Sequence, residues 1–123
     1  MIAVVDDEAP VRTMLARVLR VADYEFATFA SGEELLASLA TRVPACVILD
    51  IHMPGLSGLD VQSRLRAARV DVPVIFITAS DDPALDKLAA EANGVALLRK
   101  PFASELLLRT IREALPNRDC AAS

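Results

Sequence analysis

Aromatic residues and cysteine are scarce in this sequence of 123 residues, and tryptophan is absent. Aromatic residues make up 4% of the chain and hydrophobic residues 54%, so we expect a core packed mainly by aliphatic side chains. Two cysteines, Cys46 and Cys120, do not make a disulfide scaffold, and Cys46 lies in an apolar segment where its thiol should be buried. This use of cysteine is typical of a reducing compartment, so we expect a cytoplasmic protein.

An excess of positive charge and a long apolar segment are also missing. The chain carries 13 Lys and Arg residues against 17 Asp and Glu, a net charge of −4. Direct binding of nucleic acid is not expected, because it requires Lys and Arg to neutralise phosphates. No apolar run approaches the roughly 20 residues of a transmembrane helix, and the N-terminus lacks the basic and apolar regions of a signal peptide. We therefore expect no membrane contact.

Short apolar runs alternate with segments in which apolar residues recur at helical spacing. The runs are Ile2–Val5, Tyr24–Thr28, Cys46–Leu49, Val72–Ile77 and Val95–Leu98. They are rich in Val and Ile and alternate little, as expected of strands buried on both faces. The pattern predicts an α/β fold of the flavodoxin-like (βα)5 type, doubly wound, with a five-stranded parallel sheet in the order 2-1-3-4-5. We expect one domain over residues 1–116 and a short C-terminal tail over 117–123.

Two helix starts can also be predicted. Ser31 and Glu34 have the spacing of a capping box for the second helix. Asp82 and Pro83 suit the N-cap and the first helical position of the fourth helix.

Polar residues stand where the predicted strands end. Asp6 and Asp7 follow the first strand, Asp50 the third and Thr78 the fourth, and Lys100 comes after the fifth. Each residue alone has an ordinary structural explanation, such as a helix cap or a solvated surface charge. Strands one and three are neighbours in the predicted order, however, and their carboxyl ends meet at one edge of the sheet. The sequence therefore brings three carboxylates together.

Three converging carboxylates repel one another, so a positive group has to compensate them. Oxygen ligands without histidine or cysteine suit Mg²⁺, which is held by one or two carboxylates, waters and phosphate oxygens. Lys100 adds a second positive charge, and Thr78 adds a hydroxyl donor. Together these residues predict a site for phosphoryl transfer, with a nucleophilic carboxylate and Mg²⁺.

Four segments resemble the receiver domains of response regulators in two-component systems. They are Val4–Glu8, Leu49–Gly58, Ile77–Ala79 and Lys100–Phe102. The resemblance extends over most of the chain, from about Ile2 to Leu115. One segment would be weak support, whereas four in this order at the predicted strand ends are specific.

The resemblance implies a role for each acidic residue. Asp50 matches the residue that accepts the phosphoryl group. Asp7 and Asp50 match the direct ligands of Mg²⁺, and Asp6 matches a ligand that acts through water. The backbone carbonyl of His52 would complete the metal site. The His52 side chain could itself be a ligand or a base, but we favour an exposed side chain that takes no part.

The resemblance also implies a switch. Thr78 matches the hydroxyl that moves toward the phosphoryl group, and Lys100 matches the lysine that contacts it, with a cis bond to Pro101. The position three residues before this lysine is often Tyr or Phe in the family. Leu97 stands there in this sequence. A switch at this position would therefore use an apolar side chain.

The implied function is signalling rather than substrate turnover. A sensor histidine kinase or a phosphotransfer domain would donate a phosphoryl group to Asp50. The change would then reach the face formed by the fourth helix, the fifth strand and the fifth helix. That face would bind a downstream effector, act on an output domain outside this sequence, or form a phosphorylation-dependent dimer. Such a domain catalyses only its own phosphorylation and dephosphorylation. The sequence leaves open a stand-alone receiver or part of a longer regulator.

Three other functions would suit the same fold. A docking module that is not phosphorylated would be expected to lack Asp7, Asp50 or Lys100, and all three are present. A phosphohydrolase with an aspartate nucleophile usually has an Asp-x-Asp motif after its first strand, a spacing that Asp6 and Asp7 do not have. A flavin-binding electron carrier needs a hydroxyl- and glycine-rich loop at the place where this chain is acidic.

Overall fold

Five parallel strands form the centre of the computed structural model, which describes residues 1–115. The strands are β1 (Ile2–Val5), β2 (Phe26–Phe29), β3 (Cys46–Asp50), β4 (Val74–Thr78) and β5 (Ala96–Arg99). Their order is β2-β1-β3-β4-β5, which confirms the predicted flavodoxin-like topology. The predicted tail over 117–123, with Cys120, lies outside the described residues.

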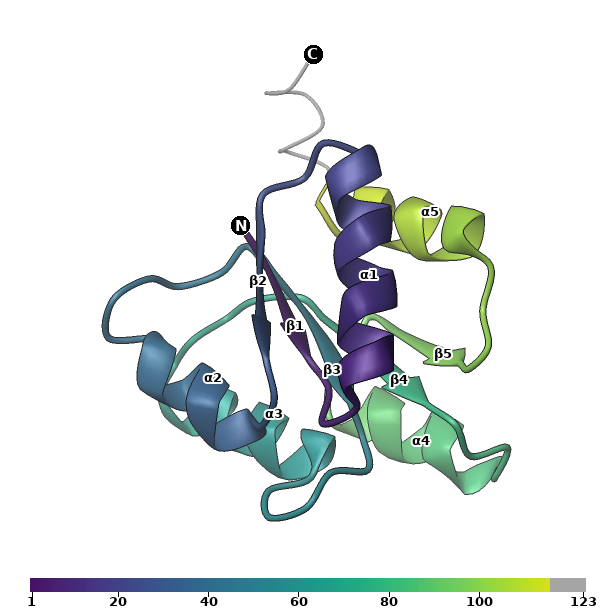
Figure 1. Cartoon of the computed structure of the whole chain (residues 1–123). Helices are drawn as coiled ribbons and strands as arrows, with labels where there is room; N and C mark the ends of the chain where they lie inside the picture. The colour runs from purple at the N-terminus through teal and green to yellow at the C-terminus, as the bar shows by residue number, and fades with distance from the viewer. Residues whose placement is uncertain (116–123) are drawn as a thin grey trace.

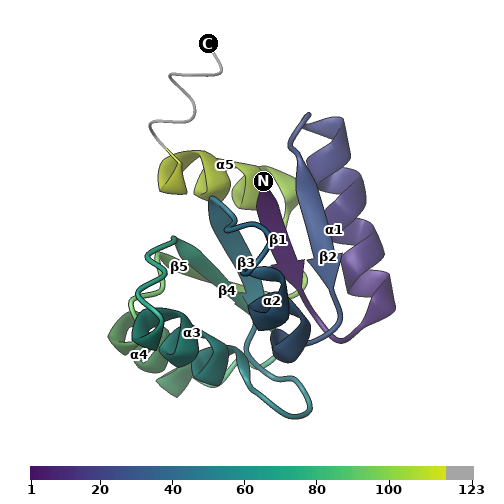
Figure 2. The same ribbon diagram turned by 90° about the vertical axis from the view of Figure 1, so that its left-hand side faces the viewer.

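Helices cover both faces of this sheet, as the crossovers of a parallel sheet require. They are α1 (Ala9–Val21), α2 (Gly32–Ser38), α3 (Gly58–Ala67), α4 (Ala84–Glu91) and α5 (Ser104–Ala114). Helices α1 and α5 lie on one face, and α2, α3 and α4 lie on the other (Figures 1 and 2). Within residues 1–115, no helix is both long enough and apolar enough to cross a membrane.

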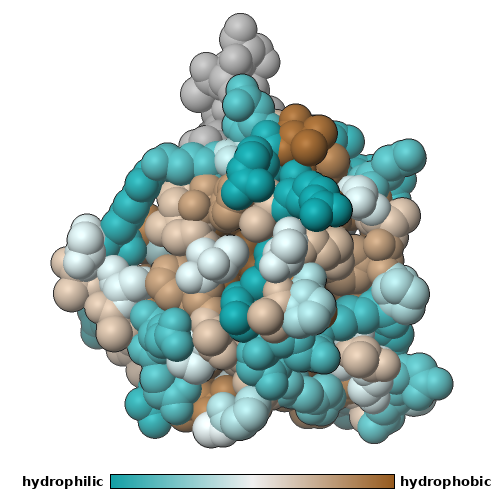
Figure 3. All heavy atoms as spheres, viewed as in Figure 1, coloured by the Kyte–Doolittle hydropathy of each residue, from teal (hydrophilic) through white to brown (hydrophobic). Residues whose placement is uncertain are grey.

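The sheet divides the core into two apolar layers, because side chains alternate between the faces of a strand. Strand β3 shows the division, since Cys46 and Ile48 pack toward α1 and α5 while Val47 and Leu49 pack toward α2, α3 and α4. All four side chains are fully buried. Burial raises the pKa of the Cys46 thiol to about 12, which keeps it protonated and confirms the expected buried thiol. On the face seen in Figure 3, hydrophilic and hydrophobic residues are interspersed.

Three strands begin later than the apolar runs predicted. The start of β2 is delayed because residues 23–25 complete the end of α1: Asp23 has a φ of 66°, and the Tyr24 N–H donates to the Leu19 carbonyl over 2.9 Å. Strand β4 starts at Val74, because Pro73 has no N–H to donate to a neighbouring strand. At β5, the start moves by one residue to Ala96.

The predicted helix caps are correct in part. The Ser31 hydroxyl accepts a hydrogen bond from the Glu34 N–H, as a capping box requires, but the Glu34 carboxylate accepts from the Ala30 N–H instead of the Ser31 N–H. Helix α4 begins one residue later than predicted, with Pro83 at its N-cap. The Asp82 carboxylate still accepts from the first helical N–H, that of Ala84, over 3.0 Å.

A tight loop follows β3 and holds the end of this strand in place. Gly55 has a φ of 76°, a conformation that other residues rarely adopt. The Gly58 N–H donates to the Ile51 carbonyl over 2.8 Å and closes the loop. A Cβ on Gly58 would lie 2.4 Å from the backbone oxygen of Asp50 and 2.9 Å from the Ile51 Cα, so this approach requires glycine.

We predict that Gly58→Ala destabilises the protein by about 1–3 kcal/mol, the usual cost of an added methyl group that a packed site cannot accommodate. The methyl group would meet backbone atoms of residues 50 and 51, which cannot move without displacing the end of β3. Urea unfolding followed by circular dichroism measures the change. Ser63→Ala on the exposed face of the same helix is the matched control, and an unfolding midpoint for Gly58→Ala equal to that of this control would contradict the prediction.

Candidate functional site

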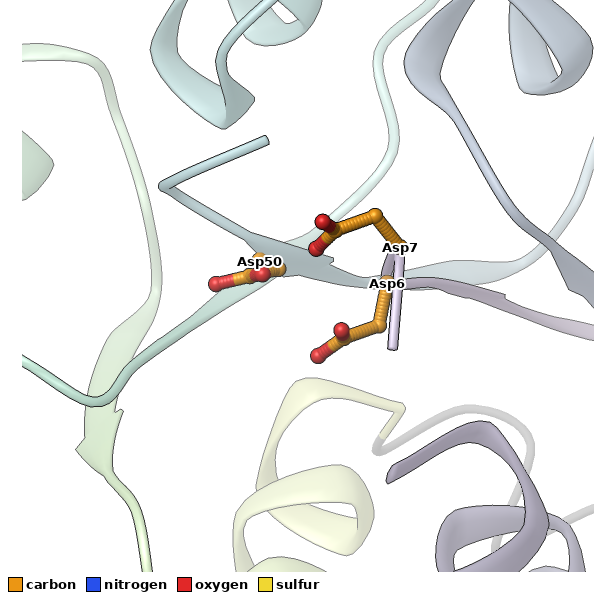
Figure 4. A group of neighbouring side chains, drawn as sticks. All are labelled: Asp6, Asp7 and Asp50. Carbon is orange, nitrogen blue, oxygen red and sulfur yellow. The ribbon is translucent and has the colours of Figure 1, made fainter. Parts of the chain in front are cut away.

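Three carboxylates meet at the carboxyl edge of the sheet. Val5 at the end of β1 is in register with Leu49 on β3, so the residues that follow, Asp6 and Asp50, emerge side by side. One carboxylate oxygen from each of Asp6, Asp7 and Asp50 lies within 4.8 Å of the other two. The three side chains leave the ends of β1 and β3 and extend to the same region (Figure 4). The structure thus brings together the three acidic residues that the sequence predicted.

The three carboxylates differ in their exposure to solvent. Asp6 is fully buried and Asp50 is 3% exposed, whereas Asp7 is exposed. Two negative charges are therefore held in a region with little water, where their repulsion is poorly screened. Asp7 leaves the group open to solvent on one side, so a small ion or a phosphate group could enter there.

Lys100 supplies the compensating charge inside the group. Its ammonium nitrogen lies 2.9 Å from an Asp6 oxygen, 3.4 Å from a Glu8 oxygen and 3.7 Å from an Asp50 oxygen. The Lys100 side chain is 14% exposed, so its ion pairs with the buried Asp6 and Asp50 are largely shielded from solvent, whereas Glu8 is exposed. Its peptide bond to Pro101 is cis, as the resemblance implied.

Asp6 is fixed by backbone contacts as well. Its Oδ1 accepts a hydrogen bond from the Glu8 N–H over 2.9 Å, and its backbone carbonyl accepts one from the Arg12 guanidinium over 2.8 Å. The sequence predicted neither of these contacts, although it placed Arg12 on a face of the first helix expected to dock a kinase. Glu8 and Arg12 follow Asp6 by two and six residues, and this closeness in the chain was the available signal.

The pKa of Asp50 is raised from its ordinary value of 3.8 to about 7. Burial is the largest cause, and the negative charge of Asp6 adds to it. Lys100 and a hydrogen bond from the His52 N–H oppose the rise, and Asp7 adds a smaller increase. Without a further positive charge, Asp50 is therefore partly protonated near neutral pH. A bound divalent cation would favour the ionised carboxylate.

The pKa of Lys100 is raised from its ordinary value. Burial would lower it, but the hydrogen bond to Asp6 and the charges of Asp50 and Asp6 outweigh this effect. The lysine is consequently fully charged at neutral pH and can attract an anion.

Thr78 is buried at the end of β4, next to the site but bonded elsewhere. Its hydroxyl oxygen accepts a hydrogen bond from the Ser80 N–H over 3.1 Å. Its backbone carbonyl accepts from the Lys100 N–H over 2.7 Å. Thr78 is thus positioned by the loop that follows β4 and by the chain after β5.

His52 and Leu97 are the two remaining residues that the sequence predicted for the site. The His52 side chain is exposed, as we favoured, and the His52 N–H donates to an Asp50 oxygen over 3.4 Å. The use of its carbonyl by a metal stays a prediction. Leu97 is partly buried and packs in the apolar layer with Phe76, with which it is in register. A switching role for Leu97 also stays a prediction.

The donor set of this site suits Mg²⁺. The Asp6, Asp7 and Asp50 cluster offers oxygen atoms alone, which hard cations prefer, and its ligand atoms are close enough to share one ion. Two of the three carboxylates are buried and require a compensating positive charge. Lys100 supplies one such charge, but divides it among three carboxylates. Asp7 and Asp50 would hold the ion, with Asp6 in its surroundings.

This arrangement of an acidic group and a lysine at the carboxyl edge of a flavodoxin-like sheet defines the class of the protein. Residues 2–112 match the response regulator receiver domain family. The chain belongs to this family, which confirms the resemblance seen in the sequence.

Several characterised relatives are regulators of the same family. The chain is 36% identical to Nodulation protein W of Bradyrhizobium diazoefficiens over 88% of its own length and 48% of that protein. It is 38% identical to Response regulator MprA of Mycolicibacterium vanbaalenii over 93% of its own length and 49% of that protein. The chain therefore spans about half the length of the curated relatives it matches.

Solved structures of response regulators have the same fold as this chain. A response regulator receiver protein from Burkholderia phymatum is 44% identical, with a TM-score of 0.84, and the match covers 94% of both chains. The chemotaxis protein CheY4 of Vibrio cholerae is 28% identical, with a TM-score of 0.84 over 93% of this chain and 97% of that one.

We predict that Asp50 makes the stability of the metal-free protein depend on pH. Because its folded-state pKa of about 7 exceeds the ordinary 3.8, the folded state binds a proton here that the unfolded state has lost. Wild-type stability should therefore fall as the pH rises through this interval. Asp50→Asn lacks this loss and should be more stable than wild type by at least about 1 kcal/mol above pH 7, with a smaller difference near pH 4.

Urea unfolding in the presence of a chelator at several pH values measures this difference. Asp71→Asn, which alters an exposed carboxylate away from the site, is the control and should follow the wild-type profile. A constant difference between Asp50→Asn and wild type across the pH range would contradict the prediction.

Proposed function

We propose that this chain is a phosphorylation-activated receiver in which Asp50 accepts a phosphoryl group from a phosphohistidine. The observation that carries this proposal is the buried Asp50 carboxylate, held beside Asp6 and Asp7 and 3.7 Å from the Lys100 ammonium group. Lys100 compensates only part of the negative charge around Asp50. Such a carboxylate is suited to react with a phosphoryl group that binds together with a cation.

The reaction would proceed at a carboxylate oxygen of Asp50. This oxygen forms a bond to phosphorus while the bond from phosphorus to the donor imidazole breaks, and the imidazole nitrogen keeps the electron pair and takes a proton. Lys100 faces the oxygens on which negative charge accumulates and stabilises them. Mg²⁺, when bound, would neutralise charge on the carboxylates and on the phosphoryl oxygens. Asp7 and Asp50 would hold it directly, Asp6 through water, and the His52 carbonyl would complete its ligands.

The same residues would convert phosphorylation into a signal. The phosphoryl group adds a charge of about −1.5 to −2. Lys100 and the Thr78 hydroxyl would then bond to it, and Thr78 would leave the Ser80 N–H that it now accepts from. This is a shift between two populated states, and reversing a 1:99 ratio requires about 5.5 kcal/mol of differential interaction. Charge-assisted hydrogen bonds can supply part of this free energy.

The partners follow from this function. A sensor histidine kinase or a phosphotransfer domain would be the donor, in the cytoplasm. Helix α4, strand β5 and helix α5 would form the output face, which would act on a downstream effector, on an output domain, or on a second copy of the phosphorylated chain. A longer regulator is consistent with the relatives, which are about twice the length of this chain. The activity would be limited to phosphorylation and dephosphorylation of Asp50.

We predict that incubation with acetyl phosphate and Mg²⁺ adds one phosphoryl group to the wild-type chain and none to Asp50→Ala. Asp50 is the nucleophile, so its removal should abolish the adduct rather than slow it. Intact-mass spectrometry measures the product, and a chelator should suppress it in the wild-type chain. Asp71→Asn is the control and should form the adduct as wild type does. An adduct of equal yield on Asp50→Ala would disprove the assignment, and the absence of an adduct from acetyl phosphate and from histidine kinases would favour a docking module.

We also predict that Mg²⁺ stabilises the folded chain through Asp7. A ligand at about a hundred times its Kd adds about 2.7 kcal/mol to the free energy of unfolding. Asp7→Asn should lose most of this gain, because a direct ligand is removed while the exposed position tolerates the change. Thermal unfolding with increasing MgCl₂ measures the gain, and Glu113→Gln on α5 is the control. An equal Mg²⁺ effect in Asp7→Asn and the control would exclude Asp7 as a ligand.

A further inference from the structure

The Arg99 side chain connects the end of β5 to the loop after β4 and to helix α4. Its Nε donates to the Ser80 carbonyl over 3.2 Å, and one of its terminal nitrogens donates to the Asp82 carbonyl over 2.8 Å. Its two terminal nitrogens also bond to the two Asp86 oxygens over 3.2 and 3.1 Å. One guanidinium therefore contacts two backbone positions of the loop of residues 79–83 and the first turn of α4.

Local hydrogen bonds link this loop to Thr78. The Ser80 N–H donates to the Thr78 hydroxyl, the Asp82 N–H to the Ser80 hydroxyl, and the Ala84 N–H to the Asp82 carboxylate, over 3.1, 3.2 and 3.0 Å. Each of these bonds spans two residues, so the first holds the loop to Thr78 and the last holds it to the start of α4. When Thr78 leaves the Ser80 N–H, as the proposed function requires, the loop is released at its beginning and stays bonded at its end and to Arg99.

The residue at the usual switch position cannot make a polar connection of this kind. Leu97 is apolar and partly buried, and it packs against the layer that contains Phe76 and Leu85. Arg99 is two residues further along the same strand, so its side chain lies on the same face of the sheet. It reaches the loop and α4 through charged and backbone groups that a leucine lacks.

We propose that Arg99 is the positioning residue that couples Thr78 to helix α4 in this protein. The proposal rests on the function proposed above. When Thr78 turns toward a phosphoryl group on Asp50, it gives up its bond to the Ser80 N–H, and the released loop takes the carbonyls of Ser80 and Asp82 to a new position. Arg99 is bonded to both carbonyls and to Asp86, so it carries the displacement to the first turn of α4.

The role of Arg99 is one of connection rather than of stability. The Arg99 and Asp86 side chains are 32% and 61% exposed, and exposed ion pairs contribute little to folding. A second exposed pair in the same protein, Arg42 with Glu25, also has two hydrogen bonds between its charged groups, over 3.0 and 2.7 Å. Arg42 bonds to Glu25 just before β2, at the opposite edge of the sheet from β5, which makes it a matched control of the same chemistry.

Hydrogen exchange of α4 tests this coupling. Beryllofluoride with Mg²⁺ serves as a stable phosphoryl mimic, and the change in exchange of a peptide over residues 84–91 is measured between the free and the treated protein. We expect a clear change in wild type and in Arg42→Ala. In Arg99→Ala the change should be smaller by about fivefold or more, the low end of usual allosteric couplings. The fluorine signal of the bound mimic should be retained in Arg99→Ala, because Arg99 does not contact Asp50.

Two further variants separate positioning from folding. Asp86→Ala removes the connection at α4 alone and should also reduce the response. Arg99→Lys keeps the charge but has three donors on a single nitrogen, so it cannot reproduce the four hydrogen bonds that Arg99 makes from three nitrogens and should not restore the response. Unfolding midpoints close to wild type in both variants would exclude a general loss of structure.

Each outcome distinguishes the two proposals. If wild type binds no mimic, the proposed function fails and the coupling fails with it. If the mimic binds and α4 of Arg99→Ala responds as in wild type, or if α4 of wild type does not respond, the role of Arg99 alone is overturned. A response restored by Arg99→Lys would assign the effect to charge rather than to positioning.

Discussion

Repulsion between buried carboxylates is the constraint on which the rest of the site depends. The pairing of β1 with β3 places Asp6 and Asp50 side by side, and the packing of the sheet removes most of the water that would screen them. Lys100 reduces the repulsion but is divided between three carboxylates. The pKa of Asp50 is raised to about 7, first by burial and then by the charge of Asp6, so Lys100 does not compensate these two effects in full. The metal-free site therefore holds unfavourable free energy that a bound divalent cation would relieve.

The order of the strands and the residues of the site could be predicted from the sequence, but the bounds of individual strands could not all be predicted. Apolar periodicity was sufficient for the sheet order, because strands buried on both faces and crossovers of fixed hand leave few topologies. The meeting of Asp6, Asp7, Asp50 and Lys100 followed from this topology alone. The bounds of β2 did not follow, because the left-handed Asp23 extends the end of α1 into the apolar run.

Contacts between side chains were the part that the sequence could not supply. The division of Lys100 between Asp6, Glu8 and Asp50 depends on how the end of β5 lies over the end of β1, which no local pattern determines. The same holds for Arg99, whose partners are 13 to 19 residues away in the chain. The capping box of Ser57 and Asp60 at the start of α3 is different, because its spacing is visible in the sequence although this cap was not among those predicted.

Strand β3 is held from both sides, with alternate side chains in the two apolar layers and a ladder to a neighbour on each edge. Asp50 therefore stands on a strand that its neighbours hold on both faces and both edges. In the proposed function, a phosphoryl group on Asp50 would displace the loops that face it rather than β3 itself. The fixed central strand would in this way set the direction of the response.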